Sequence, residues 1–197
     1  YYMLGWSQFK LGLYEHALVS YSSVLDITLA NITLMENNQL EKVEKKHQTM
    51  VEDLLRVMGL SLSYLNKADS LEWLFTKIGP KAYEIVVYDR YSEMLIEKEL
   101  YSDAIEVFRR FLKIHPLNIW SPKYQINIIS TLNAAGFKRD IYAEKVRFID
   151  VYGKGSSYWQ AHEEINRVFI KEQLEILLPE LANFHYVKAQ TALKAKK

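Results

Sequence analysis

Residues 1–25, YYMLGWSQFKLGLYEHALVSYSSVL, decide the fold of this chain. Two segments with apolar residues at helical spacing flank Gly12, and each segment carries one small residue, Gly5 or Ala17. Small residues let two helix backbones approach where the helices cross, and aromatic side chains such as Tyr21 fill the groove beside them. The stretch therefore predicts a pair of helices joined by a turn at Gly12.

The same order of residue types returns in residues 88–116. Ser92 and Ala104 take the places of Gly5 and Ala17, and Pro116 closes this second copy. A helix pair of this kind cannot bury its apolar face alone, so it must stack on its neighbours. The pattern resembles the tetratricopeptide repeat (TPR). This resemblance implies a right-handed helical solenoid with a binding role, and it does not name the partner.

The remaining helix pairs are less regular. One long helix is predicted over about residues 35–64, and its end, with Gly59, forms the degenerate first half of a second pair. The second half covers residues 71–78 and stops at Gly79-Pro80. A third pair is predicted over residues 80–115.

A fourth pair is predicted to open at Ser121-Pro122, with Ser121 as the N-cap, and to turn at Ala135-Gly136. Its second helix continues through Ala143, Val146, Phe148 and Ile149, with Ala143 as its small crossing residue. Two more helices are predicted after the loop at 153–157, over about 158–177 and 179–195.

The prediction for the whole chain is an all-α fold without strands. It is a TPR-like right-handed solenoid of about four degenerate helix pairs with extra helices. Residues 1–197 are expected to be a single solenoid segment cut from a longer protein, because Tyr1 already lies inside the first helix.

Composition excludes several classes of protein. Hydrophobic residues make up 49% of the chain and charged residues 25%, which is typical of a folded, soluble domain. The net charge of +1 gives no overall field that would hold nucleic acid or an anionic membrane. The absence of cysteine excludes disulfides and thiolate metal sites. The longest weakly charged stretch, residues 17–35, contains Asp26 and many hydroxyl side chains, so membrane insertion is not expected.

Motifs for catalysis are also missing from the sequence. The five histidines stand singly, without the spacing of zinc ligands. The segment 153–157 (GKGSS) lacks the spacing of a phosphate-binding loop and follows no buried strand. The lysines at the end of the chain are expected to complement a helix dipole. We therefore predict a protein that is not an enzyme and that uses no metal, nucleotide or other cofactor.

A second resemblance rests on four stretches spread along the chain: 53–65 (DLLRVMGLSLSYL), 79–84 (GPKAYE), 101–104 (YSDA) and 152–159 (YGKGSSYW). Together they resemble large bacterial cell-envelope TPR proteins described as components of TonB or gliding-motility systems. The resemblance covers roughly residues 1–181. It implies a non-catalytic scaffold in the periplasm, beside an ExbB/ExbD-like or TolQ/TolR-like complex, and it implies no catalytic residues.

A cytosolic TPR adaptor is an alternative. Adaptors that grip the acidic C-terminus of a chaperone use lysine and asparagine on the first helix of the first repeat. The matching positions here hold Tyr2 and Trp6, and only Arg90 falls near a position of that clamp. The sequence therefore fits a clamp for carboxylates poorly.

The first helix of each TPR pair lines the concave surface, which predicts the binding residues. The first pair supplies Tyr2, Trp6, Phe9 and Lys10, where the aromatic residues are typical of interface anchors. The other two sets are Asp89, Glu93 and Glu97 in the third pair and Lys123, Ser130 and Asn133 in the fourth. We predict a groove for a peptide or helix of another protein. Two alternatives stay open: upstream repeats cover the aromatic residues, or the chain is a structural segment that self-associates through residues 26–47.

Overall fold

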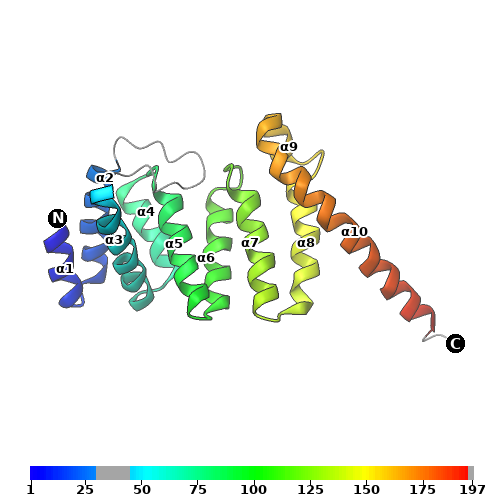
Figure 1. The fold of residues 1–197 in the computed structure, drawn as a ribbon, viewed down its shortest axis with the longest axis horizontal. Coiled ribbons are helices and arrows are strands. Elements are labelled where there is room, and N and C mark those ends of the chain that lie inside the picture. Colours follow the sequence, from blue (N-terminus) through cyan, green and yellow to red (C-terminus); the bar gives the residue numbers. More distant parts are fainter. Residues whose placement is uncertain (30–44, 195–197) are drawn as a thin grey trace. The chain divides into compact units, whose positions relative to one another are not determined.

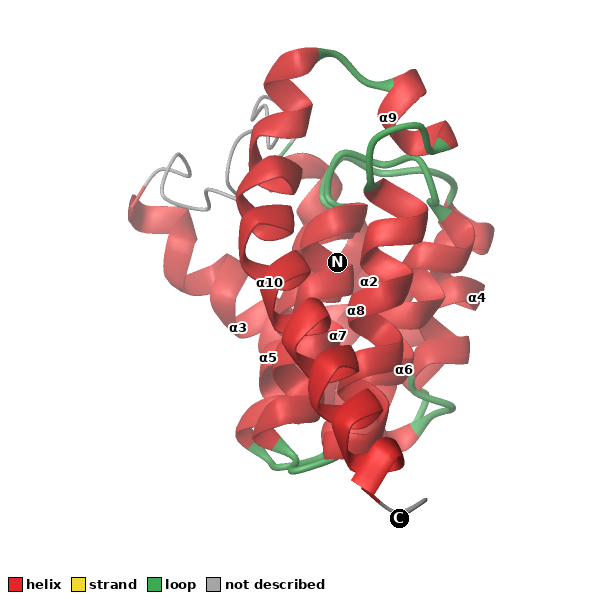
Figure 2. Ribbon diagram, turned by 90° about the vertical axis from the view of Figure 1, so that its right-hand side faces the viewer, coloured by secondary structure: helices red, strands yellow, loops and turns green. Residues whose placement is uncertain are grey.

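The computed structural model describes residues 1–29 and 45–194, and every regular element in these residues is a helix (Figures 1 and 2). The all-α prediction is confirmed for this part of the chain. None of its helices is both long and apolar enough to cross a membrane. The helices are α1 (Tyr2–Lys10), α2 (Tyr14–Thr28), α3 (Lys45–Tyr64), α4 (Ala68–Ile78), α5 (Glu84–Glu97), α6 (Tyr101–Ile114), α7 (Ser121–Ala134), α8 (Lys138–Tyr152), α9 (Ser157–Ala161) and α10 (Glu164–Lys194).

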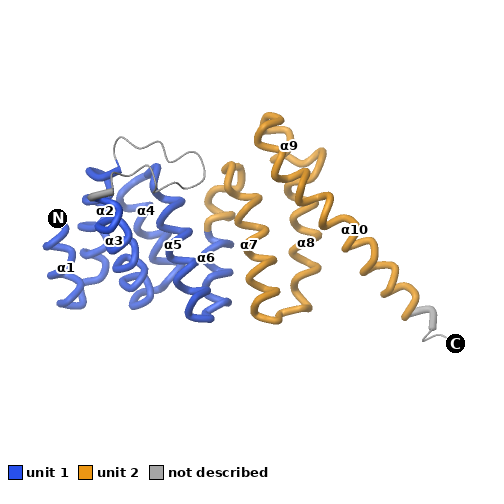
Figure 3. Tube along the Cα trace, in the orientation of Figure 1, with its two compact units in different colours: residues 1–110 blue, residues 111–197 orange. Residues whose placement is uncertain are grey.

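The helices fall into two compact units, residues 1–110 and residues 111–197 (Figure 3). Helix α6 ends in the second unit, because its last turn lies beyond residue 110. That residues 1–197 form one continuous solenoid stays a prediction.

In the first unit, α1 crosses α2 at Gly5. A Cβ atom placed on Gly5 would lie 2.5 Å from Cε1 of the Tyr21 ring, so the absence of a side chain permits this approach. Tyr21 and Ala17 are completely buried. Gly12 has φ of +74° in the turn, a conformation that side chains with a Cβ rarely adopt. The predicted first pair and its turn are confirmed.

Helix α3 packs against α2 and α5, and it buries Val51, Leu54 and Met58. It ends at Tyr64 as predicted, and it is described from Lys45 onward. The predicted helical residues 35–44 lie outside the described part of the chain. Helix α4 ends at Ile78 before Gly79, whose φ of +80° stops the helix as the sequence indicates.

The start of the third pair is tied to the end of α2 by side chains. The Tyr83 hydroxyl contacts the Ser22 carbonyl oxygen at 3.1 Å and Oδ1 of Asp26 at 3.0 Å. Lys81 forms an ion pair with the same carboxylate at 2.8 Å. Burial raises the pKa of Tyr83 well above its ordinary value, so this hydroxyl keeps its proton in the native state.

Helices α5 and α6 form the predicted third pair. Ser92 and Ala104, the two small residues of its sequence pattern, are buried at 1% and 0% exposure. The Arg110 side chain on α6 joins Asp69 and Glu72 on α4. These ion pairs link the second helices of successive pairs.

In the second unit, α7 and α8 form the fourth pair, but two predicted details are wrong. Ser121 is the first residue of α7 rather than its N-cap, and its hydroxyl donates to the His115 carbonyl oxygen at 2.6 Å. Ala143 and Val146 are exposed, because the buried face of α8 is formed by Ile141, Glu144, Phe148 and Tyr152. The alanine therefore lies outside the helix contact in which the sequence pattern places it.

The last two predicted helices are also wrong in their limits. Helix α10 continues through Pro179, and the chain breaks instead at His162, whose backbone is extended. A proline removes one hydrogen bond of the helix and clashes with the preceding turn, which kinks a helix without always ending it. Contacts with residues before α7 stabilise the break. The His162 ring contacts the Leu117 carbonyl oxygen at 2.9 Å, and Tyr158 donates to the Asn118 carbonyl oxygen at 3.2 Å.

Candidate protein-binding site

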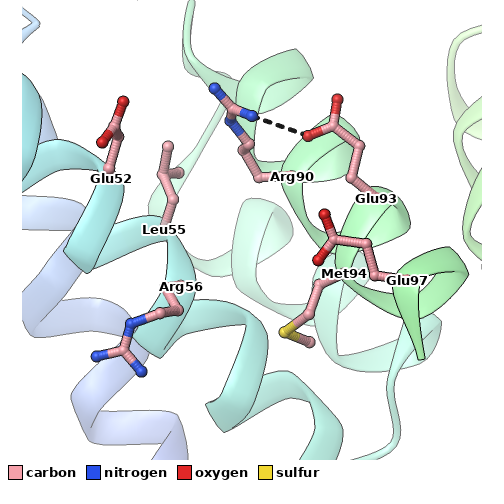
Figure 4. Close-up of a pocket in the computed structure, with 7 residues that line it drawn as sticks. All are labelled: Glu52, Leu55, Arg56, Arg90, Glu93, Met94 and Glu97. Atoms are coloured by element: carbon pink, nitrogen blue, oxygen red, sulfur yellow. Dashed lines mark hydrogen bonds and ion pairs between the residues drawn. The ribbon is translucent and has the colours of Figure 1, made fainter.

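A pocket of about 270 Å³ lies between α3 and α5 in the first unit (Figure 4). Both helices are the first members of their pairs. Each contributes residues at helical spacing from one face: Glu52, Leu55 and Arg56 from α3, and Arg90, Glu93, Met94 and Glu97 from α5. The pocket thus combines two apolar side chains with five charged ones.

The apolar part of the pocket is formed by Leu55 and Met94. Leu55 is 4% exposed, whereas Met94 is half-buried and adaptable, because its unbranched thioether has several rotatable bonds. Gly59, one turn after Leu55 on α3, leaves space for the Met94 side chain. A Cβ atom on Gly59 would lie 3.1 Å from both Sδ and Cε of Met94. The glycine therefore controls where the methionine sits.

The arginines of the pocket already have carboxylate partners. Arg90 Nη1 lies 3.0 Å from Glu93 Oε2 on the same helix. Arg56 Nη2 lies 2.7 Å from Asp53 Oδ1, and the Tyr2 hydroxyl donates to the other oxygen of Asp53 at 2.9 Å. Both ion pairs are exposed to solvent, so each contributes only about 0–1 kcal/mol to stability.

Two carboxylates of the pocket are left without such a partner. Within the described side chains, no ion pair involves Glu52 or Glu97. The two residues belong to different helices, and both are exposed. In residues 1–29 and 45–194, no three acidic or histidine side chains come together as a possible metal site. Glu52 and Glu97 therefore each place a single negative charge at the pocket.

A buried tyrosine lies close to the Asp53 network. Tyr21 is completely buried, and burial, followed by the proximity of Tyr2 and Asp53, raises its pKa to about 12. Its hydroxyl is therefore neutral at physiological pH. Tyr21 supports the helix crossing at Gly5, while its neighbour Asp53 holds Arg56 at the pocket.

The structure brings some of the predicted binding residues together and separates others. Glu93 and Glu97 line the pocket. Tyr2 donates a hydrogen bond to Asp53, which forms an ion pair with the lining residue Arg56. Asp89 lies half-buried on α5, and Lys10 is exposed at the end of α1. Lys123, Ser130 and Asn133 are exposed on α7 in the other unit.

The predicted aromatic anchors Trp6 and Phe9 belong to an aromatic cluster at the ends of three helices. Phe9 meets Tyr14 of α2 edge-on at 5.6 Å and lies 6.2 Å from Tyr64 of α3. Tyr14 and Tyr64 stack at 4.7 Å, and Trp6 lies 6.0 Å from Phe9. Phe9 thus packs against other side chains of the protein. Contact of Trp6 with a partner stays a prediction.

Sequence reasoning missed Glu52, Leu55, Arg56 and Met94 as lining residues, and noted Arg90 only against the clamp pattern. A signal for α3 was present: Gly59 occupies the place that Gly5 has in the first pair, so Arg56 takes the place of Tyr2. No such signal marked Leu55 and Met94, because a pattern of apolar residues does not separate a pocket wall from a core.

The described residues 1–29 and 45–194 are thus all-helical, with successive helix pairs in the first unit and one pair, α7 and α8, followed by α9 and α10 in the second. Comparison of the chain with protein-family models, with curated proteins and with solved structures finds no match.

Proposed function

We propose that this chain is a non-catalytic protein-interaction scaffold of the TPR-like solenoid class, which binds a peptide or helix of its partner at the pocket between α3 and α5. The observation that carries the proposal is the pocket itself. It lies between the first helices of two pairs, which are the helices that line the binding surface in TPR proteins. Its two apolar and five charged side chains offer a partner both apolar and ionic contacts.

The strength of the site follows from its size. Burying one aliphatic side chain of the partner on Leu55 and Met94 gives about 1.5–3 kcal/mol, and each exposed ion pair adds about 0–1 kcal/mol. Association costs at least about 4 kcal/mol. One anchor in this pocket therefore gives only weak binding, and a stable complex needs further contacts. Trp6 and Lys10 on α1 are the proposed additional contacts.

We further propose that the partner belongs to a bacterial envelope complex, of the kind that contains ExbB/ExbD-like proteins, and that the chain works in the periplasm. This part of the proposal is supported by the resemblance of the stretches 53–65, 79–84, 101–104 and 152–159. The alternative is that the chain is an adaptor in the cytosol.

A structural role is the second candidate, and exposed apolar side chains on α1 favour it. Met3 on α1 is 73% exposed and Leu11, which directly follows the helix, is 74% exposed, so this part of the chain offers apolar side chains to another repeat or to a second copy of the chain. Sedimentation velocity of the purified chain, compared with a Met3→Lys variant, distinguishes this role. Dimers that disappear in the variant support it, and a monomer at all concentrations contradicts self-association.

The proposed function is tested by recovery and rebinding of a partner. The wild-type chain, a Glu97→Arg variant and a Glu172→Arg control are immobilised and exposed to extract of the source organism. Glu172 is exposed on α10 and does not line the pocket. A partner retained by the wild type and the control is then purified, and its affinity for all three chains is measured. We expect at least tenfold weaker binding to Glu97→Arg, about 1.4 kcal/mol, and equal affinities for all three would contradict the proposal.

A further inference from the structure

The charges around the α3–α5 pocket point to the chemistry of its ligand. We infer that the pocket binds a basic segment of the partner, in which a lysine or arginine side chain stands beside an aliphatic one. This inference rests on the proposed function, since it assumes that the pocket receives a peptide. It assigns Glu52 and Glu97 to the cation, and Leu55 and Met94 to the aliphatic side chain.

The pairing of the arginines favours a basic over an acidic ligand. The guanidinium of Arg56 is held by Asp53, which is held in turn by the Tyr2 hydroxyl, and Arg90 is held by Glu93. An acidic ligand would have to compete with these carboxylates. A basic ligand instead meets Glu52 and Glu97, which form no ion pair among the described side chains. Complementary charge of this kind contributes to specificity and to the rate of association.

The position of the two carboxylates also indicates how the segment lies. Glu52 stands on α3 and Glu97 on α5, so they approach the pocket from different helices (Figure 4). Leu55 follows Glu52 by three residues on α3, and Met94 precedes Glu97 by three residues on α5. Each acidic residue is therefore about one helical turn from one apolar residue. A segment in which aliphatic and basic residues are close neighbours can contact the apolar and the acidic residues of both helices at the same time.

The size of the pocket argues for side chains as its occupants. Its volume of about 270 Å³ lies just below the range of about 300–1,000 Å³ that is common for sites that enclose whole small molecules. The acidic side chains of the described region form no cluster suited to a metal ion. A lysine or arginine with an adjacent leucine or methionine needs only a shallow apolar seat and separated carboxylates, and the pocket offers both.

The methionines of the chain provide a direct reporter of this binding. Wild-type protein carrying ¹³C-labelled methionine methyl groups is observed by NMR, and the Met94 signal is assigned from the spectrum of a Met94→Leu variant. Met3, which is exposed on α1, reports non-specific binding, and the completely buried Met58 reports the integrity of the core. The probes are three capped hexapeptides: GLKLKG, the acidic GLELEG and the polar GSKSKG.

We expect GLKLKG to shift the Met94 methyl signal in a saturable manner, with Met3 unchanged. GLELEG and GSKSKG should bind at least tenfold more weakly, and added salt should weaken the binding of GLKLKG. A variant with both Glu52→Gln and Glu97→Gln, whose Met58 signal and circular dichroism match the wild type, should bind GLKLKG at least tenfold more weakly.

Two results would overturn the inference. If GLELEG shifts Met94 as strongly as GLKLKG, the pocket binds peptides without preference for a basic segment. The inference is then wrong, while the proposed function is not contradicted. If no probe gives a saturable shift of Met94, the assigned ligand chemistry is wrong. The partner's affinity for Glu97→Arg then decides separately whether the pocket is a binding site at all.

Discussion

The crossing of α1 and α2 can be tested by a single methyl group. In the structure, a Cβ atom on Gly5 would lie 2.5 Å from Cε1 and 2.7 Å from Cδ1 of Tyr21. Carbon atoms in favourable contact are about 3.5–4.0 Å apart, so Gly5→Ala forces a buried ring or a whole helix to move by about 1 Å. Such overpacking costs about 1–3 kcal/mol. Alanine returns about 1 kcal/mol of helix propensity, which leaves a net loss of up to about 2 kcal/mol.

The matched control is Gly59→Ala, in which the methyl group meets the end of the flexible Met94 side chain at 3.1 Å and lies at an ordinary contact distance of 3.5 Å from Cδ2 of Tyr91. The same gain in helix propensity applies at both positions, so it cancels when the two variants are compared. We expect Gly59→Ala to be as stable as the wild type or slightly more stable. Gly5→Ala should be less stable than Gly59→Ala by about 1–3 kcal/mol.

The assay is equilibrium unfolding in urea, followed by circular dichroism on the full chain and analysed by the shift of the midpoint. If Gly5→Ala unfolds at the same or a higher urea concentration than Gly59→Ala, then Gly5 is not a point of close approach. A small residue would then not mark the crossing of the first helix pair.

Three further predictions concern stability. Ala104→Trp should destabilise the third pair by several kcal/mol, because Ala104 is 0% exposed and overpacking alone costs about 1–3 kcal/mol; an unchanged melting temperature would contradict the position of Ala104 in the core. Gln125→Leu removes the amide that donates to the buried Glu144 carboxylate at 2.7 Å and should cost about 1.5–3 kcal/mol, measured by urea unfolding, whereas no loss would show that this bond is dispensable. Burial raises the pKa of Tyr21 and Tyr158 to about 12 from 10.0, so the unfolded chain releases these protons first. Their contribution is complete below pH 10 and is lost as the pH rises toward 12, and absorbance at 295 nm should show delayed ionisation together with unfolding; normal ionisation at pH 10 in the folded protein would refute this burial.

The first and third helix pairs were predictable because their sequences repeat a local rule. Gly5 is small where α1 and α2 approach, and Ala104 is completely buried, so the residue type itself indicates both positions. The rule failed at α8 because Glu144 occupies the buried face, where the Gln125 amide donates to its carboxylate. A sequence pattern assigns a charged residue to solvent and the neighbouring alanine, Ala143, to the contact. The contact with Gln125 of α7 lets the charged side chain of Glu144 take the buried position instead of Ala143.

The site was predictable in part for a similar reason. Glu93 and Glu97 follow from their offset from Ser92 in a repeat, whereas Met94 is apolar and takes its position from Gly59 on another helix. Contacts between helices distant in sequence are absent from the local pattern. The break at His162 has the same origin, because it depends on a contact with the Leu117 carbonyl oxygen.

The central claim, that partners bind at the α3–α5 pocket, is tested most directly by site-specific photocrosslinking in the source organism. The photoreactive residue p-benzoylphenylalanine replaces Glu93 at the pocket, since its carboxylate is already held by Arg90 and is not assigned to the ligand. The same residue replaces the exposed Glu172 of α10 as a control. We predict that one partner protein crosslinks to position 93 and not to position 172. Crosslinking of the partner at position 172 without any at position 93, in chains that still bind it, would contradict the claim.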